Sequence, residues 1–508
     1  MFVRKKRHRS GAISVVVVDK SGGGYREIKN FGVVSTDEDI DILCQKAKQW
    51  ILHYGGQQSL DFDGSNKTEA DIAYALSNIT HLLLNAPQQI LSKVYDSIGF
   101  NAINDDILRH LVIARICEPQ SKLATAAYLK SYFDEDISHY KIYRYMDKLY
   151  STQKELVQKI SVEHTRKILN GSIGLMFYDV TTLYFEAAPS DDIRQAGFSK
   201  DGKTSEAQIV LGLLVSADGY PLSYSIFNGS QYEGYTMIPL VDDFIRRFSL
   251  SDFVVVADSG LMNENNISLL RSAGYKYVIG ARIKNESTEL KEWILSLSKE
   301  DHALYEHKRG ETDRLIVGYS QHRASKDAYN RDKGIAKLQK SFKSGKLTKD
   351  KINKRGYNKF LTISKDVEVA INMDKVTQDA AWDGLKGYIT NTKLNAEEVV
   401  SQYHGLWVVE RAFRISKSNL EMRPIFHFTE KRIEAHICIC FIAYKVYREL
   451  QRLLPLYGID LSIDKVLKIA KTIPTILVNL PNGANTAQTL FLTDEQKVIK
   501  PLFDVSEF

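Results

Sequence analysis

The stretch Ile173–Glu186, IGLMFYDVTTLYFE, decides the fold of this chain. Its apolar and aromatic residues predict a buried strand, because short apolar runs with polar boundaries are typical of strands covered on both faces. Asp179 ends this run and is followed by Thr181 and Thr182. A carboxylate at the mouth of a central strand is unfavourable unless it is paired or binds a cation. The stretch therefore predicts a strand that delivers an acid to a functional site.

The same pattern occurs at Phe253–Gly260, FVVVADSG, where Asp258 follows the valines of a second strand. Two buried strands that each end in an aspartate indicate two walls of one metal site. The elements between and after them are two strands joined by the turn ADGYP, a helix, the Asp258 strand, a helix and another strand (209–216, 222–227, 236–248, 253–258, 265–273 and 277–282). This order is that of an α/β ribonuclease H-like core, in which the first and fourth strands are parallel neighbours. Asp179 and Asp258 are then expected at one edge of the sheet.

Composition limits the class of protein. The 508 residues are 44% hydrophobic and 26% charged with a net charge of +6, as in soluble globular proteins. Four cysteines without a CxxC pair fit a reducing cytoplasm and argue against a structural zinc site. The basic start MFVRKKRHRSG lacks the apolar run of a signal peptide, and no segment is apolar enough to span a membrane. We expect a soluble cytoplasmic protein without a membrane partner.

Six segments are predicted along the chain. They are a β-hairpin and helical region (1–100), a helical, DNA-binding, helix-turn-helix-like region (101–170), the first part of the catalytic core (171–284), a mixed, β-rich basic insertion (285–380), the second part of the core (381–455) and a helical C-terminal region (456–508).

Two regions favour contact with nucleic acid without deciding it. Helices are predicted at Ser121–Tyr132 and Ser138–Leu149, and the second interleaves Lys141, Arg144 and Lys148 with tyrosines, as in a helix-turn-helix or a plain helical bundle. The insertion carries a lysine-rich run from Lys337 to Lys359, and the N-terminus carries another basic cluster, Arg4–Arg9. Phosphate contact and a solvated charged surface both explain these two clusters.

A third acid is predicted on a long helix that begins near Asn395, with Glu398 as its capping partner. Tyr403, Glu410 and Lys417 are spaced by seven residues and therefore share one helix face. Glu410 is either a third wall of the site or a surface glutamate. On the following helix, Glu430–Leu453, the neighbours of His436 are apolar, which indicates packing rather than metal binding.

These motifs resemble those of DDE transposases of bacterial insertion sequences, in the insertion-sequence-4 superfamily, over about residues 100–450. The matching motifs are YDVTT (178–182), ADSG (257–260) and the third motif, called YREK, at Tyr403, Glu410 and Lys417. Leu406 replaces the arginine of that motif. Further similarity lies in GFSKDGK (197–203), NGS (228–230), DGLKGYITN (383–391) and the insertion between the second aspartate and the glutamate.

The resemblance implies a transposase that cleaves DNA at the ends of an insertion sequence and joins the 3′-OH ends to target DNA. Asp179, Asp258 and Glu410 would be the catalytic residues and would hold two Mg²⁺ ions, for which Mn²⁺ can substitute. The implied partners are double-stranded DNA, as terminal inverted repeats and as target, and a second copy in a synaptic homodimer acting at the bacterial nucleoid. The expected DNA- and phosphate-binding residues are Tyr403, Lys417, Arg414, Arg411, Lys200 and Lys203.

Three alternatives remain at this point. A ribonuclease H-like nuclease without strand transfer would share the acids. A non-catalytic DNA-binding protein derived from a transposase would be expected to have lost one of them. A phosphatase or sugar-phosphate enzyme leaves the basic insertion and the helical glutamate unexplained.

Overall fold

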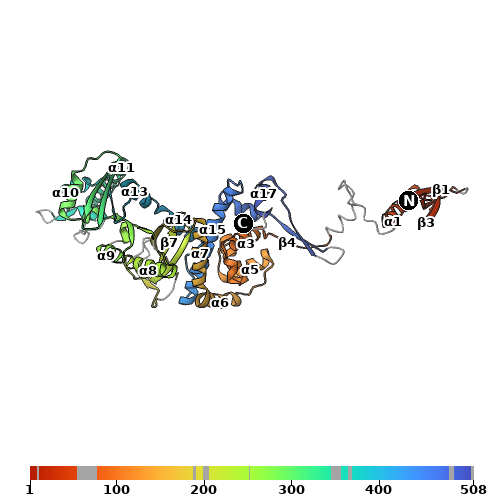
Figure 1. Ribbon diagram of the computed structural model, residues 1–508, viewed down its shortest axis with the longest axis horizontal. Helices are drawn as coiled ribbons and strands as arrows, with labels where there is room; N and C mark the ends of the chain where they lie inside the picture. The colour runs from red at the N-terminus through yellow and green to blue at the C-terminus, as the bar shows by residue number, and fades with distance from the viewer. Residues whose placement is uncertain are drawn as a thin grey trace. The chain divides into compact units, whose positions relative to one another are not determined.

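The computed structural model describes residues 1–8, 11–53, 77–186, 190–197, 205–250, 252–261, 263–344, 356–363, 369–479 and 485–504 (Figure 1). The chain divides into two compact units. One comprises Met1–Thr80 with Leu477–Thr486, and the other comprises His81–Ile476 with Ala487–Phe508. Among the helices that the structure describes, none has the length and apolarity needed to cross a membrane.

The first unit contains a three-stranded antiparallel sheet and a helix. The strands β1 (Phe2–Arg7), β2 (Ile13–Asp19) and β3 (Arg26–Val34) pair in that order, and α1 (Asp37–His53) follows. Val15 and Val17 pack against apolar residues of α1. The sequence predicted a hairpin with a basic leader, and this was wrong in one respect. The leader is itself strand β1, because its backbone pairs with β2 along its whole length.

The second unit begins with helices that pack around a helix from the end of the chain. These helices are α3 (Ala86–Ile98), η1 (Phe100–Ile103), α4 (Asp106–Cys117), α5 (Lys122–Phe133), α6 (His139–Lys148), the π-turn η2 (Leu149–Gln153) and α7 (Lys154–Ile168). The C-terminal helix α15 (Glu430–Leu456) contacts α3, α4, α6 and α7 (Figure 1). Its side chains from Ile433 to Phe441 are almost all buried, so the predicted packing helix is confirmed. Ser121 and Ser138 cap α5 and α6, as the predicted starts of these helices require.

The core of this unit is a mixed sheet in the order β11-β12-β15-β10-β9-β5-β7-β6, with β8 also paired to β7. Its first strands are β5 (Leu175–Tyr184), β6 (Gln195–Ala196), β7 (Ala207–Ser216), β8 (Pro221–Asn228), β9 (Val254–Ala257) and β10 (Lys276–Ala281). β5 is antiparallel to β7, whereas β5, β9 and β10 are parallel neighbours. The predicted α/β, ribonuclease H-like arrangement is therefore confirmed.

Helices cover both faces of this sheet. Alternate residues of β5, Met176 and Tyr178, belong to one cluster with the helices η3 (Glu233–Tyr235), α8 (Met237–Phe248), η4 (Ser259–Leu261) and α9 (Glu264–Ser272). Phe177 belongs to the opposite cluster, which contains Tyr403 and Val409 of α13 (Ala396–His404) and α14 (Trp407–Ser418). Since successive side chains of a strand point to opposite faces, this alternation places Asp179 on the face covered by α13 and α14.

The insertion extends the core sheet instead of forming a separate layer. Its elements are η5 (Ile283–Asn285), α10 (Thr288–Ser296), β11 (Leu304–Arg309), β12 (Asp313–Tyr319), α11 (Gln321–Lys343), η7 (Gly356–Phe360), β13 (Leu361–Ile363), β14 (Val369–Ile371) and α12 (Met373–Ala380). β15 (Leu385–Thr390) then pairs antiparallel with both β10 and β12. The sequence predicted the strands of this region but not its longest element, α11, which carries exposed Lys337, Lys340 and Lys343.

The C-terminal region is not purely helical. It contains α16 (Ile463–Ala470), β16 (Thr475–Asn479), β17 (Asn485–Thr489), α17 (Asp494–Val498) and α18 (Pro501–Asp504). The strands β16 and β17 form a small sheet with β4 (Ile79–Leu83). The sequence reasoning predicted only helices here, because strand pairing with a distant segment leaves no local pattern.

Candidate active site

The two aspartates lie next to each other in the sheet. In the parallel pairing of β5 with β9, the last pair is Tyr178 with Ala257, so Asp179 and Asp258 occupy the next position on each chain. On both strands the preceding pattern of buried residues directs the acid to the face covered by α13 and α14. The expectation that Asp179 ends its strand was wrong, because β5 continues to Tyr184. It is β9 that ends, and its end opens the space beside Asp179.

Two consecutive helices, rather than the single predicted helix, bring the glutamate to these aspartates. α13 begins with the predicted capping box of Asn395 and Glu398. It ends at His404, and α14 begins at Trp407. At the break, Gly405 lies directly on Phe177 of β5, where a Cβ atom would clash with the aromatic ring. The missing side chain therefore lets the helix pair approach the strand that carries Asp179.

All three predicted acids line one pocket of about 310 Å³. Its other lining residues are Lys386, Tyr403, His404, Leu406, Trp407 and Val409. Glu410 and Asp258 are exposed to the pocket, and Asp179 is half-buried. The sequence analysis missed Lys386 and His404. Lys386 lies within a stretch quoted above, DGLKGYITN, where a lysine interrupts an otherwise apolar strand, and this interruption is the signal that identifies it.

Tyr403 fixes the second aspartate. Its hydroxyl donates a hydrogen bond of 2.6 Å to Oδ1 of Asp258. Partial burial opposes ionisation of this carboxylate, but Tyr403, the backbone amides of Ser259 and Gly260, and Lys386 outweigh it and lower the pKa of Asp258. Burial and the same carboxylate raise the pKa of Tyr403, which keeps the hydroxyl protonated as a donor. Asp258 is therefore held as an anion.

Lys386 places a positive charge among these acids. Burial and the neighbouring Arg323 lower the pKa of Lys386, while Asp258 and Glu410 act in the opposite direction. Its ammonium group also lies 4.3 Å from the centre of the Tyr403 ring. Leu406, at the position of the family's arginine, is buried at the break between α13 and α14. The positive charge of the pocket thus comes from β15 and not from the helix motif.

The chemistry of the donors fits a hard divalent cation, which prefers carboxylate oxygens. In the described part of the chain, however, no three Asp, Glu, His or Cys side chains lie close enough together to hold a single ion. Oδ1 of Asp179 accepts a hydrogen bond of 2.8 Å from the amide of Val180, and Asp258 accepts from Tyr403. The residues are suitable, and their side chains must draw closer to enclose a metal.

The other predicted DNA-binding residues lie outside this pocket. On α14, Arg411 lies over the ring of Trp407 at 5.9 Å, Arg414 is exposed and Lys417 is half-buried two turns beyond Glu410. Lys200 and Lys203 lie outside the described residues.

On α6, Lys141 and Arg144 are exposed, whereas Lys148 forms an ion pair of 2.9 Å with Asp105. The polar residues of this helix face outward and its apolar residues are buried. A DNA-reading role for this helix remains a prediction.

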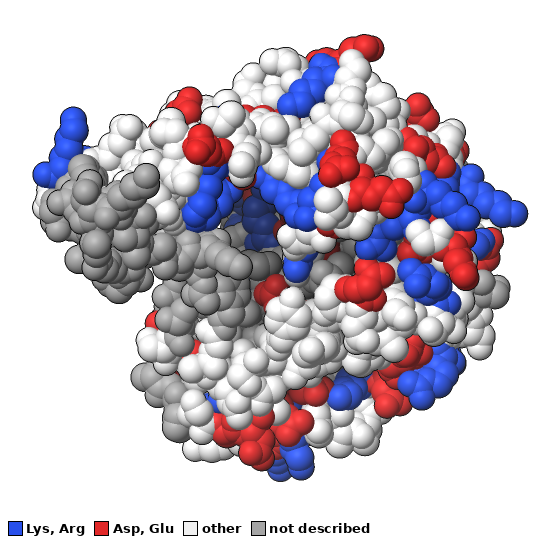
Figure 2. Space-filling view, turned by 90° about the vertical axis from the view of Figure 1, so that its left-hand side faces the viewer, with Lys and Arg blue, Asp and Glu red and all other residues white. Residues whose placement is uncertain are grey.

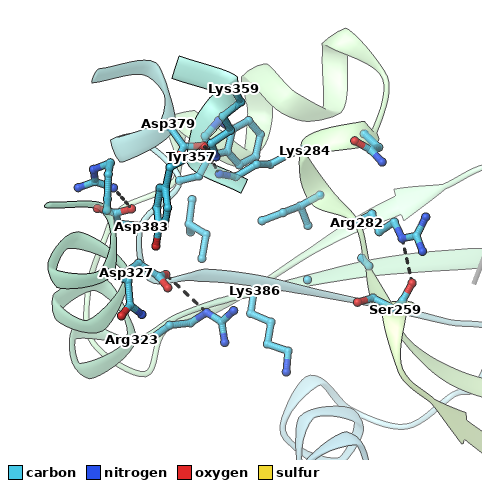
Figure 3. Close-up of a pocket in the computed structure, with 18 residues that line it drawn as sticks. Ser259, Arg282, Lys284, Arg323, Asp327, Tyr357, Lys359, Asp379, Asp383 and Lys386 are labelled. Carbon is cyan, nitrogen blue, oxygen red and sulfur yellow. Dashed lines mark hydrogen bonds and ion pairs between the residues drawn. The ribbon is translucent and has the colours of Figure 1, made fainter. Parts of the chain in front are cut away.

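A larger cavity of about 590 Å³ adjoins the pocket and shares Lys386 with it (Figure 3). Six basic and three acidic residues line it, namely Arg282, Lys284, Arg323, Arg331, Lys359, Lys386, Asp327, Asp379 and Asp383. Lys284 and Lys359 both reach Asp379, at 2.6 and 2.8 Å, while Arg323 and Lys386 lie together at the other side (Figure 3). In Figure 2, Lys and Arg side chains gather around a recess on the end of the second unit that carries α10 and α11.

This fold and site define an α/β protein with three acids converging at one sheet edge. The family model of the transposase DDE domain matches residues 171–445, which is more than half of the chain. The chain therefore belongs to the transposase DDE domain family.

No curated protein matches the chain in sequence. Two solved structures are similar to it at low levels. A cryo-EM structure of the piggyBac transposase synaptic complex with hairpin DNA has 10% identity and a TM-score of 0.40, and the match covers 76% of this chain and 78% of that chain. A Mos1 transposase paired-end complex with the left transposon end has 10% identity and a TM-score of 0.16, with coverages of 34% and 57%. The assignment to the family is based on the family model alone.

Proposed function

We propose that this protein is a DNA transposase that cleaves DNA at the ends of a mobile element and joins the freed 3′-OH ends to target DNA. The observation that carries the proposal is the convergence of Asp179, Asp258 and Glu410 on one pocket, in a chain of the transposase DDE domain family. The sequence resemblance supports the finer assignment to the bacterial insertion-sequence-4 superfamily with a YREK-type third motif.

Asp179, Asp258 and Glu410 are the residues that would hold two Mg²⁺ ions. When bound, such ions activate the attacking oxygen and stabilise the leaving 3′ oxygen of an in-line phosphoryl displacement. Tyr403 keeps Asp258 ionised and fixes its orientation through the hydrogen bond described above. Each acid thus has its own support: a neighbouring strand for Asp179, a phenol for Asp258 and a helix covering the sheet for Glu410.

The DNA phosphates need positive charge near the acids. Lys386 supplies it inside the pocket, in the role that the family's arginine would have at Leu406. Arg411, Arg414, Lys417, Lys200 and Lys203 are further proposed phosphate ligands along the path to the pocket. A homodimer that pairs two element ends is proposed from the sequence resemblance and is tested by the molar mass of the protein bound to end DNA.

The decisive experiment measures Mg²⁺-dependent cleavage and joining of labelled DNA that carries the flanking inverted repeats. Asp179→Asn, Asp258→Asn and Glu410→Gln are compared with wild type, and DNA binding is measured for each protein. The matched control is Asp252→Asn, a change of the same kind near the same strand at an exposed residue that pairs with Lys276. We expect all three pocket variants to bind DNA without chemistry and the control to remain active.

Each other outcome contradicts part of the proposal. Full activity of one pocket variant removes that residue from the site. Cleavage without joining by wild type replaces the transposase with a nuclease. DNA binding without either reaction identifies a non-catalytic DNA-binding protein.

A further inference from the structure

A small basic cavity lies among the helices of the second unit, away from the acidic pocket. Its volume is about 120 Å³, and it is formed by the N-terminus of α5, by α6, by the segment that follows α14 and by α15. The lining residues that matter here are Arg115, Lys122, Tyr143, Glu421, His427 and His436. Exposed Phe426 also lines the cavity, so it opens to the surface. We call it the basic cavity.

Two cations are buried in the basic cavity without an acidic partner. Lys122 is 4% exposed and Arg115 is 6% exposed. Arg115 donates a hydrogen bond of 3.1 Å to the carbonyl oxygen of Gln120, and within the described residues the ammonium group of Lys122 has no acceptor. The one carboxylate among the described lining residues is Glu421, an exposed residue that forms no ion pair with either cation. Burial and Arg115 lower the pKa of Lys122 to about 7.

Lys445 shows how this chain treats a buried lysine that needs no ligand. It is completely buried on α15, yet its ammonium group donates to the carbonyl oxygen of Ser161 at 3.0 Å and to the hydroxyl of Thr165 at 2.6 Å. Burying a charge without such partners is costly. Lys122 therefore lacks the partners that the protein itself provides elsewhere.

His436 gives an independent indication of an anion. Its residue is 5% exposed, and its Nε2 lies 3.1 Å from the carbonyl oxygen of Met422. Its other ring nitrogen, Nδ1, is buried and has no hydrogen-bond partner among the described residues. Burial, Lys122, Arg115 and His427 lower the pKa of His436. An anion in the cavity would neutralise these charges and allow Nδ1 to take up a proton and donate a hydrogen bond.

The start of α5 adds further donors. Ser121 caps the amide of Ala124, and the amides of Lys122 and Leu123 at the first two helical positions have no acceptor within their helix. The N-terminus of a helix favours negative charge through these amides and through its dipole. Lys122, Arg115, His436 and the helix start thus present donors of one sign to one small space.

We propose that the basic cavity binds a phosphate group, and that this group is a phosphodiester of the DNA backbone. The choice of DNA depends on the proposed function. It is favoured because Tyr143, which lines the cavity, belongs to α6, whose Lys141 and Arg144 are exposed to solvent. A strand of DNA held along α6 would bring a phosphate to the mouth of the cavity. Such a contact positions the protein on DNA without reading its sequence.

The test measures DNA affinity against salt concentration for wild type, Lys122→Met and the control Lys130→Met. Methionine keeps most of the volume of the buried lysine and needs no hydrogen bond. Lys130 lies on the same helix, is exposed and pairs with Asp136 at 3.6 Å, so its replacement changes the net charge equally. Each duplex, one with the inverted repeat and one of unrelated sequence, is titrated between roughly 50 and 200 mM salt. Inorganic phosphate alone is titrated in a second arm, followed by calorimetry.

We expect Lys122→Met to weaken binding to both duplexes by the same factor and to reduce the slope of log K against log salt by about 0.9, the value for one lost phosphate contact. Lys130→Met should change neither quantity to this extent. Phosphate binding that Lys122→Met abolishes, combined with unchanged DNA binding, would overturn the assignment to DNA. Unchanged binding of both DNA and phosphate would overturn the site itself.

These outcomes are separable from those of the proposed function. A wild type that shows the Lys122-dependent contact but neither cleaves nor joins DNA would keep the basic cavity and reject the transposase. Active wild type with an unchanged salt slope in Lys122→Met would do the opposite.

Discussion

The acidic pocket and the basic cavity contain charges of opposite sign, and the protein supports these charges to different degrees. In the pocket, the charge of Asp258 is stabilised by a tyrosine hydroxyl, two backbone amides and Lys386, so its pKa is lowered. In the cavity, the charge of Lys122 is opposed by burial and by Arg115, so its pKa is lowered to about 7. A lowered pKa favours the charged form of an acid and the neutral form of a base. The comparison shows that the pocket maintains its anion and that the cavity awaits one.

The largest expected effect separates the acids of the pocket from acids elsewhere. Asp258→Asn should reduce the rate of DNA cleavage by at least about 10³-fold, the scale seen when a group that acts in the transition state is lost. Asp252→Asn, at the exposed approach to the same strand, should leave the rate within the error of wild type. Single-turnover cleavage at saturating DNA measures both. Similar losses in the two proteins would mean that the pocket has no special role.

The basic cavity should show the opposite relation between binding and stability. Because the pKa of Lys122 is lower in the folded protein than in the unfolded chain, the unfolded chain binds more protons between about pH 7 and pH 10.5, and stability rises with pH in that window. Lys122→Met removes this penalty, so the free energy of unfolding at pH 7 should increase by about 1–4 kcal/mol in chloride buffer. The gain should disappear as the pH rises towards the pKa of an unfolded lysine.

Lys445→Met is the matched control for that stabilisation. The ammonium group of Lys445 has two acceptors, so its removal should reduce the free energy of unfolding by about 1–3 kcal/mol. Urea denaturation measures both proteins. If both variants lose stability, the distinction between a satisfied and an unsatisfied buried lysine is wrong.

Gly405 tests the geometry of the acidic pocket alone. A methyl group at this position would overlap the ring of Phe177. We expect Gly405→Ala to cost about 1–3 kcal/mol, as overpacking does, and to reduce cleavage because α14 and Glu410 move away from β5. Gly174→Ala is the control, since nothing lies within 4 Å of its Cβ position. A fully active and stable Gly405→Ala would show that the helix break does not position the glutamate.

The smallest expected effect concerns the hydrogen bond to Asp258. Tyr403→Phe removes one of the groups that lower the pKa of this carboxylate, so that pKa should rise. Activity that requires ionised Asp258 is lost as the pH falls through this pKa, and the acid side of the pH–rate profile should therefore move to higher pH. Rate profiles of the two proteins at saturating DNA measure the shift. An unchanged profile would remove Tyr403 from the control of Asp258.

Local patterns in the sequence predicted much of the fold. The apolar runs before Asp179 and Asp258 identified two central strands, since burial on both faces requires continuous apolar residues. Asn395 and Glu398 identified the start of α13, because a capping box is complete within four residues. The three acids of the site were predicted in the same way, each from its own strand or helix.

Tertiary structure decided what no local pattern contains. The end of one helix at Gly405 depends on the ring of Phe177, which lies more than two hundred residues earlier in the chain. Lys386 becomes a pocket residue only because β15 pairs with β10 and β12. The basic cavity combines Lys122 of α5 with His436 of α15. Hydrophobic period and capping act over a few residues and were therefore visible in the sequence, whereas burial and the pairing of charges depend on packing between distant segments.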